Sequence, residues 1–430
     1  MTELLQQLNA PRREERLCAL RELKEAVLRG EAPQPPQTPF VNNHIHTIYS
    51  FSPYSPAKAA YLAWQNGLKT AGIMDHDSIA GAEEFRAAGE ILGMPVTCGM
   101  ELRVKMAHTA IGMRRINNPD QVGVAYVAMH GIPHDAYGEI AAFMQPYREA
   151  RNRRNRAMVE KINTLSAPCG VCLDFDKDVL PLSRWKEGGS VTERHVLFAL
   201  TQKILSVCPT PQALLAFLRE KMGLQISEKA QTLLAHFDPA LTPYDVLGVL
   251  KSNLVEKIYV DAADELPTVE EYIALCRRTG AISAYAYLGD VGDSVTGDKK
   301  AQAFEDGYLD LLFAELARLG FDAVTYMPTR NTQAQLRRVM GLCEQYGLFQ
   351  ISGEDINSPR QSFLCEKLTE DAFTHLIDAT WALIGHEQAA SADRARGMFS
   401  PRTVSDMPSL AQRIPVFARL AQCAAGKTGA

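Results

Sequence analysis

Short polar motifs recur along this chain, and most of them stand directly after a short apolar run. A β/α barrel places its functional residues in this position, at the carboxyl ends of its strands. The pattern therefore favours an α/β fold whose strand ends meet at one face. The six motifs are His44-Ile45-His46, Asp75-His76-Asp77, Gly99-Met100-Glu101, His130-Gly131-Ile132-Pro133-His134, Glu193-Arg194-His195 and Gly353-Glu354-Asp355-Ile356-Asn357.

The spacing of the apolar runs supports the same fold class. Predicted strands at 70–74 and 96–98 alternate with predicted helices at 56–68 and 80–92, as in parallel β/α units. Ser55 followed by Pro56 predicts the start of the first of these helices. The alternation returns later, with helices at 269–278, 301–319 and 333–346 and strands at 281–286, 323–326 and 348–352.

A long stretch between these two parts lacks the alternation. It is rich in charge and in long helical patterns, predicted at 137–165, 211–222 and 243–258, and we interpret it as an inserted, mostly helical cap domain. The predicted division is 1–39, an N-terminal helix and proline-rich spacer; 40–134, the first part of the barrel; 135–265, the insertion; 266–360, the second part of the barrel; and 361–430, a C-terminal helical extension.

Composition narrows the class of protein. At 430 residues and 46% hydrophobic content, the chain can bury a large core. A formal net charge of −5 gives no general reason to expect a nucleic-acid or membrane partner, and no apolar run reaches spanning length. The nine scattered cysteines and the lack of a signal-peptide pattern predict reduced thiols in a cytoplasmic protein.

The His-x-His motif indicates a metal centre. Alternate residues of a strand project to the same side, so His44 and His46 would present their imidazoles together. Two neutral ring nitrogens suit a transition metal, and the carboxylates of Glu101 and Asp355 would complete the coordination. One such motif alone is more often an ordinary polar patch. Several of them at strand ends favour a metal site.

In this order, the motifs resemble those of the PHP superfamily, named for polymerase and histidinol phosphatase. The resemblance implies a distorted (β/α)7 barrel that holds divalent metals and mostly hydrolyses phosphoesters. The arginines of the predicted helix at 137–165, with Arg194 and His195, are similar to the nucleotide-cleaving branch of that family. The best-matching motifs are His44-x-His46, Asp75-His76-Asp77, Gly99-x-Glu101 and the turn at 352–355.

The resemblance also implies a role for individual residues. His76 matches a ligand of a further metal. His130 could offer another imidazole from a returning strand, with His108 as the competing candidate. We expect one divalent ion (Mn, Zn or Fe) and allow for a second. The first ion would be held by His44, His46, Glu101 and Asp355.

Three positions depart from the family pattern. Where relatives carry metal ligands, this chain has Phe51, Tyr287 and Asn357. Phenylalanine cannot coordinate a metal, and tyrosine and asparagine are poorer ligands than histidine for borderline ions. The sequence therefore supports one metal better than a full trinuclear centre.

These residues predict a metal-dependent phosphoesterase that acts on a small phosphorylated metabolite or nucleotide. A metal-bound hydroxide would attack phosphorus, and His76 or His195 would protonate the leaving alkoxide. Arg194 would bind the phosphate, with Arg360 and Arg330 as alternatives. Two other hypotheses stay open. One is a hydrolase of amides or other non-phosphate bonds, motivated by the lost ligands. The other is a non-catalytic binding protein with a degraded metal site.

Overall fold

In the computed structural model, which describes residues 1–291 and 303–428, seven strands form one sheet in chain order. A parallel bridge between Ile45 and Ile356 joins the ends of the first and last strands, so the sheet is a nearly closed barrel. The predicted α/β barrel is confirmed. The strands are β1 (Val41–Ile45), β2 (Thr70–His76), β3 (Val96–Lys105), β4 (Val124–His130), β5 (Ile282–Ala286), β6 (Ala323–Tyr326) and β7 (Phe349–Ser352).

The strand β4 departs from the regular β/α pattern. It runs antiparallel to both β3 and β5, whereas all other neighbouring pairs are parallel. A parallel pair needs a long crossover, usually a helix, but an antiparallel pair can be joined by a loop. Residues 106–123, between β3 and β4, contain no helix, so the chain turns back on itself there.

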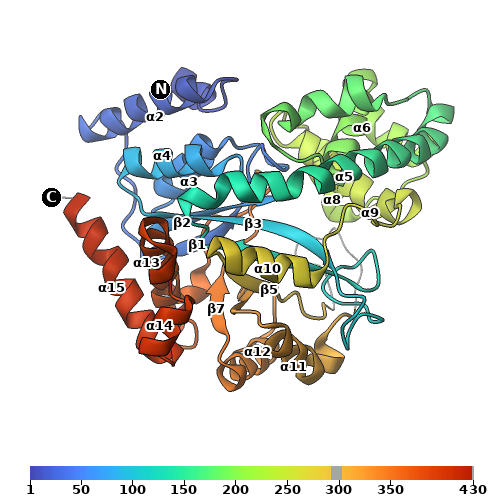
Figure 1. Cartoon of the computed structure of the whole chain (residues 1–430). Coiled ribbons are helices and arrows are strands. Elements are labelled where there is room, and N and C mark those ends of the chain that lie inside the picture. The colour runs from blue at the N-terminus through green and yellow to red at the C-terminus, as the bar shows by residue number, and fades with distance from the viewer. Residues whose placement is uncertain (292–302, 429–430) are drawn as a thin grey trace.

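Helices cover the outside of the sheet, and the main hydrophobic core lies between the two layers (Figure 1). The helix after β1 begins where predicted, because the Ser55 side chain accepts a hydrogen bond from the Lys58 amide and Pro56 occupies the first turn. The helix predicted from 301 begins at Leu309, and residues 301 and 302 lie outside the described residues. These helices are α3 (Pro56–Gln65), α4 (Ala82–Leu92), α10 (Val269–Thr279), α11 (Leu309–Leu319) and α12 (Gln333–Tyr346).

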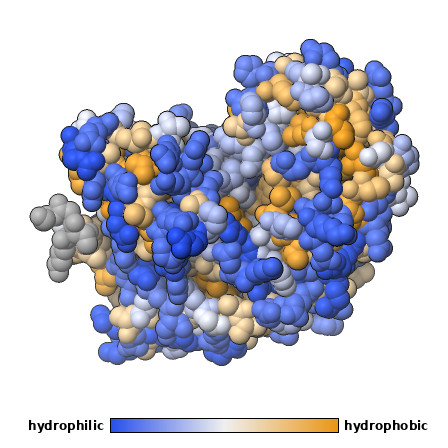
Figure 2. Space-filling view, turned by 90° about the horizontal axis from the view of Figure 1, so that it is seen from above, coloured by the Kyte–Doolittle hydropathy of each residue, from blue (hydrophilic) through white to orange (hydrophobic). Residues whose placement is uncertain are grey.

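Between β4 and α10 the chain is helical and has a second hydrophobic cluster, which Phe51 from the loop after β1 joins. This segment is the green and yellow lobe at the upper right of Figure 1, and apolar residues gather on it in the view from above (Figure 2). The domain boundaries stay a prediction. Its helices are α5 (Tyr137–Ser166), α6 (Glu193–Val207), α7 (Pro211–Ala216), α8 (Glu228–His236) and α9 (Thr242–Ile258).

Helix α6 was not predicted from the sequence. Its first turn has a capping box in which His195 occupies the position usually held by Glu or Gln, so the common sequence signal is absent. This places Glu193, Arg194 and His195 in the first turn of a helix instead of at a strand end.

The two ends of the chain pack against the barrel. At the N-terminus, a fully buried ion pair joins Arg16 to Glu84 of α4, with Arg16 Nε 2.8 Å from the carboxylate. Helix α13 packs against α15, and its Leu383 and His386 side chains lie next to Gly131. In the described residues, no helix is both long and apolar enough to cross a membrane. The terminal helices are α1 (Thr2–Gln7), α2 (Arg13–Leu28), α13 (His375–Ala392), α14 (Pro401–Asp406) and α15 (Leu410–Thr428).

Candidate metal centre

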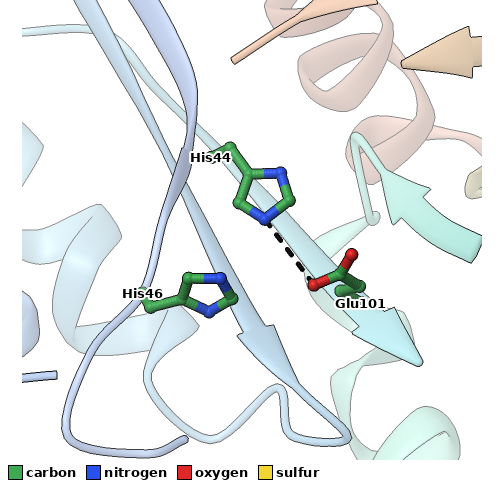
Figure 3. Close-up of side chains that lie close together, drawn as sticks. All are labelled: His44, His46 and Glu101. Atoms are coloured by element: carbon green, nitrogen blue, oxygen red, sulfur yellow. Dashed lines mark ion pairs between the residues drawn. The ribbon is translucent and has the colours of Figure 1, made fainter. Parts of the chain in front are cut away.

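The end of β1 brings two imidazoles to a carboxylate of β3 (Figure 3). His44, His46 and Glu101 each offer a ligand atom, and these atoms all lie within 4.8 Å of one another. His44 Nε2 is 3.6 Å from Glu101 Oε2. This separation suits a shared cation better than a direct hydrogen bond, which would be shorter.

Two further predicted ligands border this group. The register of β2 and β3 pairs His76 with Glu101, and His76 Nδ1 lies 3.1 Å from Glu101 Oε2. On the other side, His46 Nε2 lies 3.1 Å from Asp355 Oδ1. The His46 and His76 rings stack with their centroids 4.7 Å apart. The structure therefore brings together five of the six residues predicted as metal ligands, while their role as ligands stays a prediction.

Two buried ring nitrogens at this site lack a hydrogen bond within the described residues. His46 Nε2 is close to Asp355 without the geometry of a hydrogen bond, and His130 Nε2, at the end of β4, has no partner. A buried polar atom normally finds a partner, so each lone pair is suited to a cation. His108, the alternative to His130, is exposed in the loop after β3. His134 lies 3.3 Å from Glu387 of α13.

The pKa values place most of this cluster in the protonation state that metal binding requires. Burial opposes ionisation of Glu101, but His76, His44 and His46 outweigh it and lower its pKa to about 2. Burial also opposes ionisation of Asp355, and the neighbouring His46 still holds its pKa well below the usual range. Burial lowers the pKa of His76 to about 4 and that of His130 to about 3. The acids are therefore charged and these two imidazoles neutral at neutral pH.

His44 differs from the other histidines. Burial lowers its pKa, but the negative charges of Glu101 and Asp355 outweigh burial, and the net pKa is raised. The raised pKa favours a protonated ring, which would balance part of the negative charge, and a cation bound here would compete with that proton. Two carboxylates and several imidazoles within one cluster fit a divalent metal such as Mn, Zn or Fe.

Asp75 supports the candidate site in a way that the sequence did not reveal. Its carboxylate is buried and accepts hydrogen bonds from the Thr47 amide at 2.7 Å, the Thr47 hydroxyl at 2.6 Å and the Ser50 hydroxyl at 2.6 Å. These hydrogen bonds connect the turn that follows His46 to Asp75 of β2. The Ser50 hydroxyl also lies 3.4 Å from His46 Nδ1, so Asp75 influences the orientation of a candidate ligand through Ser50.

The three substituted ligand positions have other uses. Phe51 packs against His195, with ring centroids 5.2 Å apart, and joins the hydrophobic cluster of the helical lobe. The Tyr287 hydroxyl donates to Asp306 at 2.7 Å. Asn357 donates to Asp355 Oδ1 at 2.6 Å, so it holds the carboxylate of a candidate ligand in place.

The predicted phosphate-binding arginines differ in their surroundings. Arg194 is half-buried at the start of α6, its charge acts on Asp355, and it makes no hydrogen bond or ion pair with the described residues. Arg360 is bound to Asp245 of α9 at 2.6 and 2.8 Å. Arg330 donates to the Leu288 carbonyl. Of these three arginines, Arg194 is the one without a partner among the described residues, so its guanidinium can bind a ligand.

His195 is held by its own helix. Its Nδ1 accepts a hydrogen bond from the Thr192 amide at 3.0 Å, which leaves the proton on Nε2. Burial, followed by the charge of Arg151, lowers its pKa to about 3. Near neutral pH the ring is neutral and can donate a hydrogen bond from Nε2.

The comparisons with known proteins bear on the fold. No protein-family model and no curated protein matches this sequence. A solved structure from Bifidobacterium adolescentis, described as a candidate metal-dependent phosphoesterase, is 21% identical with a TM-score of 0.52, over 80% of this chain and 96% of that one. An amidohydrolase from Chromobacterium violaceum, solved with bound sulfate and no metal, is 16% identical with a TM-score of 0.50, over 76% of this chain and 90% of that one. At these identities the likeness shows a shared fold.

Proposed function

We propose that this protein is a metal-dependent phosphoesterase acting on a small phosphorylated metabolite or nucleotide. The observation that carries the proposal is the position of Arg194, whose charge acts on Asp355 of the cluster and whose guanidinium has no hydrogen bond or ion pair with the described residues. A bound cation would neutralise the charge of a phosphate ester, and the planar guanidinium of Arg194 would donate directed hydrogen bonds to its oxygens. The shared fold with a candidate phosphoesterase supports the same proposal.

Each part of the cluster has a distinct role in this proposal. A divalent ion held by His44, His46, Glu101 and Asp355 would supply Lewis-acid activation of water and of the phosphoryl group. Arg194 binds the remaining phosphate oxygens with its two parallel N–H groups and keeps phosphorus next to the cluster.

His76 and His195 are the proposed proton donors to the leaving oxygen. Their pKa values are about 4 and about 3, so near neutral pH neither ring is in the imidazolium form before the substrate binds. A phosphate anion bound nearby favours the charged form of an imidazole and raises its pKa. We therefore propose that the substrate itself brings one of these rings into the range of an acid catalyst.

A second candidate is hydrolysis of an amide or another non-phosphate bond. It is favoured by the use of Phe51, Tyr287 and Asn357 for packing and hydrogen bonding, which leaves fewer ligands for the several ions that phosphate chemistry often uses. The fold shared with an amidohydrolase agrees with it.

One experiment separates these candidates. Purified protein is stripped with a chelator, reloaded with Mn²⁺, Zn²⁺ or Fe²⁺, and assayed for bound metal and for phosphate release from p-nitrophenyl phosphate, nucleotides and sugar phosphates. A parallel panel contains cyclic amides. We expect about one ion per chain and metal-dependent phosphate release. Turnover of amides alone would support the second candidate, and a loaded protein without any turnover would indicate a binding protein.

A further inference from the structure

Arg151 of α5 connects two residues that directly flank the candidate site. Its Nη1 donates to the Asp77 carboxylate, and its Nη2 donates to Glu193 Oε2 at 2.9 Å. Asp77 follows His76 in the chain, and Glu193 precedes Arg194. One buried guanidinium therefore joins the turn of the metal cluster to the turn that carries the candidate phosphate ligand.

The Asp77 end of this connection is conformationally unusual. Asp77 has a φ of +54°, in the left-handed region that residues other than glycine rarely adopt. Its amide donates to the Glu101 carbonyl at 2.8 Å, and its side chain is held by Arg151. These contacts keep the turn after β2 in place, and that turn carries His76 next to Glu101.

The Glu193 end belongs to a buried network of balanced charge. Arg103 and Arg154 contact both Glu193 and Glu265, and Arg154 Nε lies 2.7 Å from the Glu265 carboxylate. With Arg151 and Asp77, the network holds three cations and three anions. Breaking a buried pair leaves an uncompensated charge, so the network resists rearrangement. Arg151 is the member that also reaches Asp77.

We propose that Arg151 is a positioning residue that sets the separation between the histidine–carboxylate cluster and Arg194. This inference rests on the proposed function. The two N–H groups used by Arg151 belong to one rigid planar fork, so the spacing of the two acids follows the shape of the guanidinium. A lysine has a single charged nitrogen and cannot impose the same spacing.

The test is a double-mutant cycle with Arg151→Lys, Arg194→Ala and the double variant. The readouts are the KM and kcat for p-nitrophenyl phosphate, the Kd for inorganic phosphate by calorimetry, and the metal content. Because small misplacements of a binding group cost up to about 100-fold, we expect Arg151→Lys to raise the phosphate Kd and the KM at least about 10-fold. In the Arg194→Ala background the same change should add less than about 2-fold, since the group it positions is gone.

Two further variants keep the test decisive. Arg154→Lys is the matched control, because Arg154 lies on the same helix and binds Glu193 but makes no contact with Asp77. We expect a similar loss of stability and less than about 3-fold change in phosphate Kd. Asp77→Asn keeps nearly the same size and weakens the contact between Asp77 and Arg151. It should also raise the phosphate Kd, and this effect should be smaller in the Arg194→Ala background.

The possible failures are distinguishable. If Arg194→Ala leaves phosphate binding unchanged, or the wild type releases no phosphate, the proposed function is wrong. If Arg194→Ala weakens phosphate binding but Arg151→Lys costs the same factor in both backgrounds, Arg151 has only a structural role and this inference is overturned. Equal effects of Arg151→Lys and Arg154→Lys on the phosphate Kd would also overturn it.

Discussion

His46 Nε2 lies 3.1 Å from Asp355 Oδ1, which joins the end of the first strand to the turn after the last. The residues beside them, Ile45 and Ile356, form the bridge that closes the sheet. The candidate metal site therefore lies at the junction where the barrel closes. An ion bound there would hold the first and last strands together and stabilise the folded state.

The first prediction concerns His46. Ligand binding at 100 times the Kd stabilises a fold by about 2.7 kcal/mol, so Mn²⁺ or Zn²⁺ should raise the Tm of the wild type. His46→Ala should abolish this shift and the metal-dependent release of p-nitrophenol. Bound metal is measured by elemental analysis and Tm by calorimetry. His236→Ala, at an exposed position on α8, is the control. A variant His46→Ala that still binds one ion per chain would contradict the assignment.

Asn357 should tune metal affinity without being essential for folding. Its amide donates to Asp355 Oδ1 at 2.6 Å, and removal of such a partner typically costs about 10- to 100-fold in metal affinity. We expect this loss in Asn357→Ala, measured by competition with a chromogenic chelator. Asn331→Ala is the comparison, because Asn331 is also buried but donates to the Leu288 carbonyl. An affinity equal to that of the wild type would show that Asp355 needs no such support.

Arg194 and Arg360 should differ sharply in their effect on substrate binding. A hydrogen bond to a charged group contributes about 1.5–3 kcal/mol, so Arg194→Ala should raise the KM for a phosphoester about 10- to 100-fold. Arg360 is paired with Asp245, so Arg360→Ala should change the KM much less. Steady-state kinetics on the metal-loaded variants measures both. The reverse order would move the phosphate-binding role to Arg360.

Phe51 should matter for stability and not for metal binding. It is 7% exposed and packs in the hydrophobic cluster of the helical lobe. Truncation of a buried phenylalanine typically costs about 3–5 kcal/mol, so Phe51→Ala should lower the free energy of unfolding by about that amount. Urea unfolding measures the loss, and elemental analysis should still find one ion per chain. A loss of metal at unchanged stability would instead place Phe51 in the metal site.

Glu305 should make stability depend on pH. Burial raises its pKa from 4.5 to about 7, against the hydrogen bonds it accepts from Tyr285 and from the Gly289 and Leu288 amides. Because the folded state holds this proton more tightly than the unfolded state, its contribution is complete below about pH 4.5 and is lost as the pH rises through about 7. The loss amounts to about 3 kcal/mol.

The variant Glu305→Gln cannot ionise, so it should escape this loss. Its free energy of unfolding, relative to that of the wild type, should increase by about 3 kcal/mol between about pH 4.5 and pH 8. Urea unfolding of both proteins at several pH values measures the difference. A difference that stays constant over this range would show that Glu305 titrates normally.

Local sequence patterns were sufficient for much of the architecture. Ser55 and Pro56 start α3 where predicted, and the apolar runs before Asp75 and Glu101 are strands. The start of α6 was missed because its capping box has His195 where Glu or Gln usually stands. The direction of β4 could not be read either, since it depends on how residues 106–123 fold back.

The sequence by itself determined the α/β alternation and the candidate ligands, because apolar periodicity and motif chemistry are properties of neighbouring residues. Only the tertiary structure decided which candidates share a site. It brought the charge of Arg194 within range of Asp355 and paired Arg360 with Asp245, and it buried His130 while exposing His108. The reason is that distances between side chains far apart in the chain are set by barrel closure and by the packing of the helical lobe.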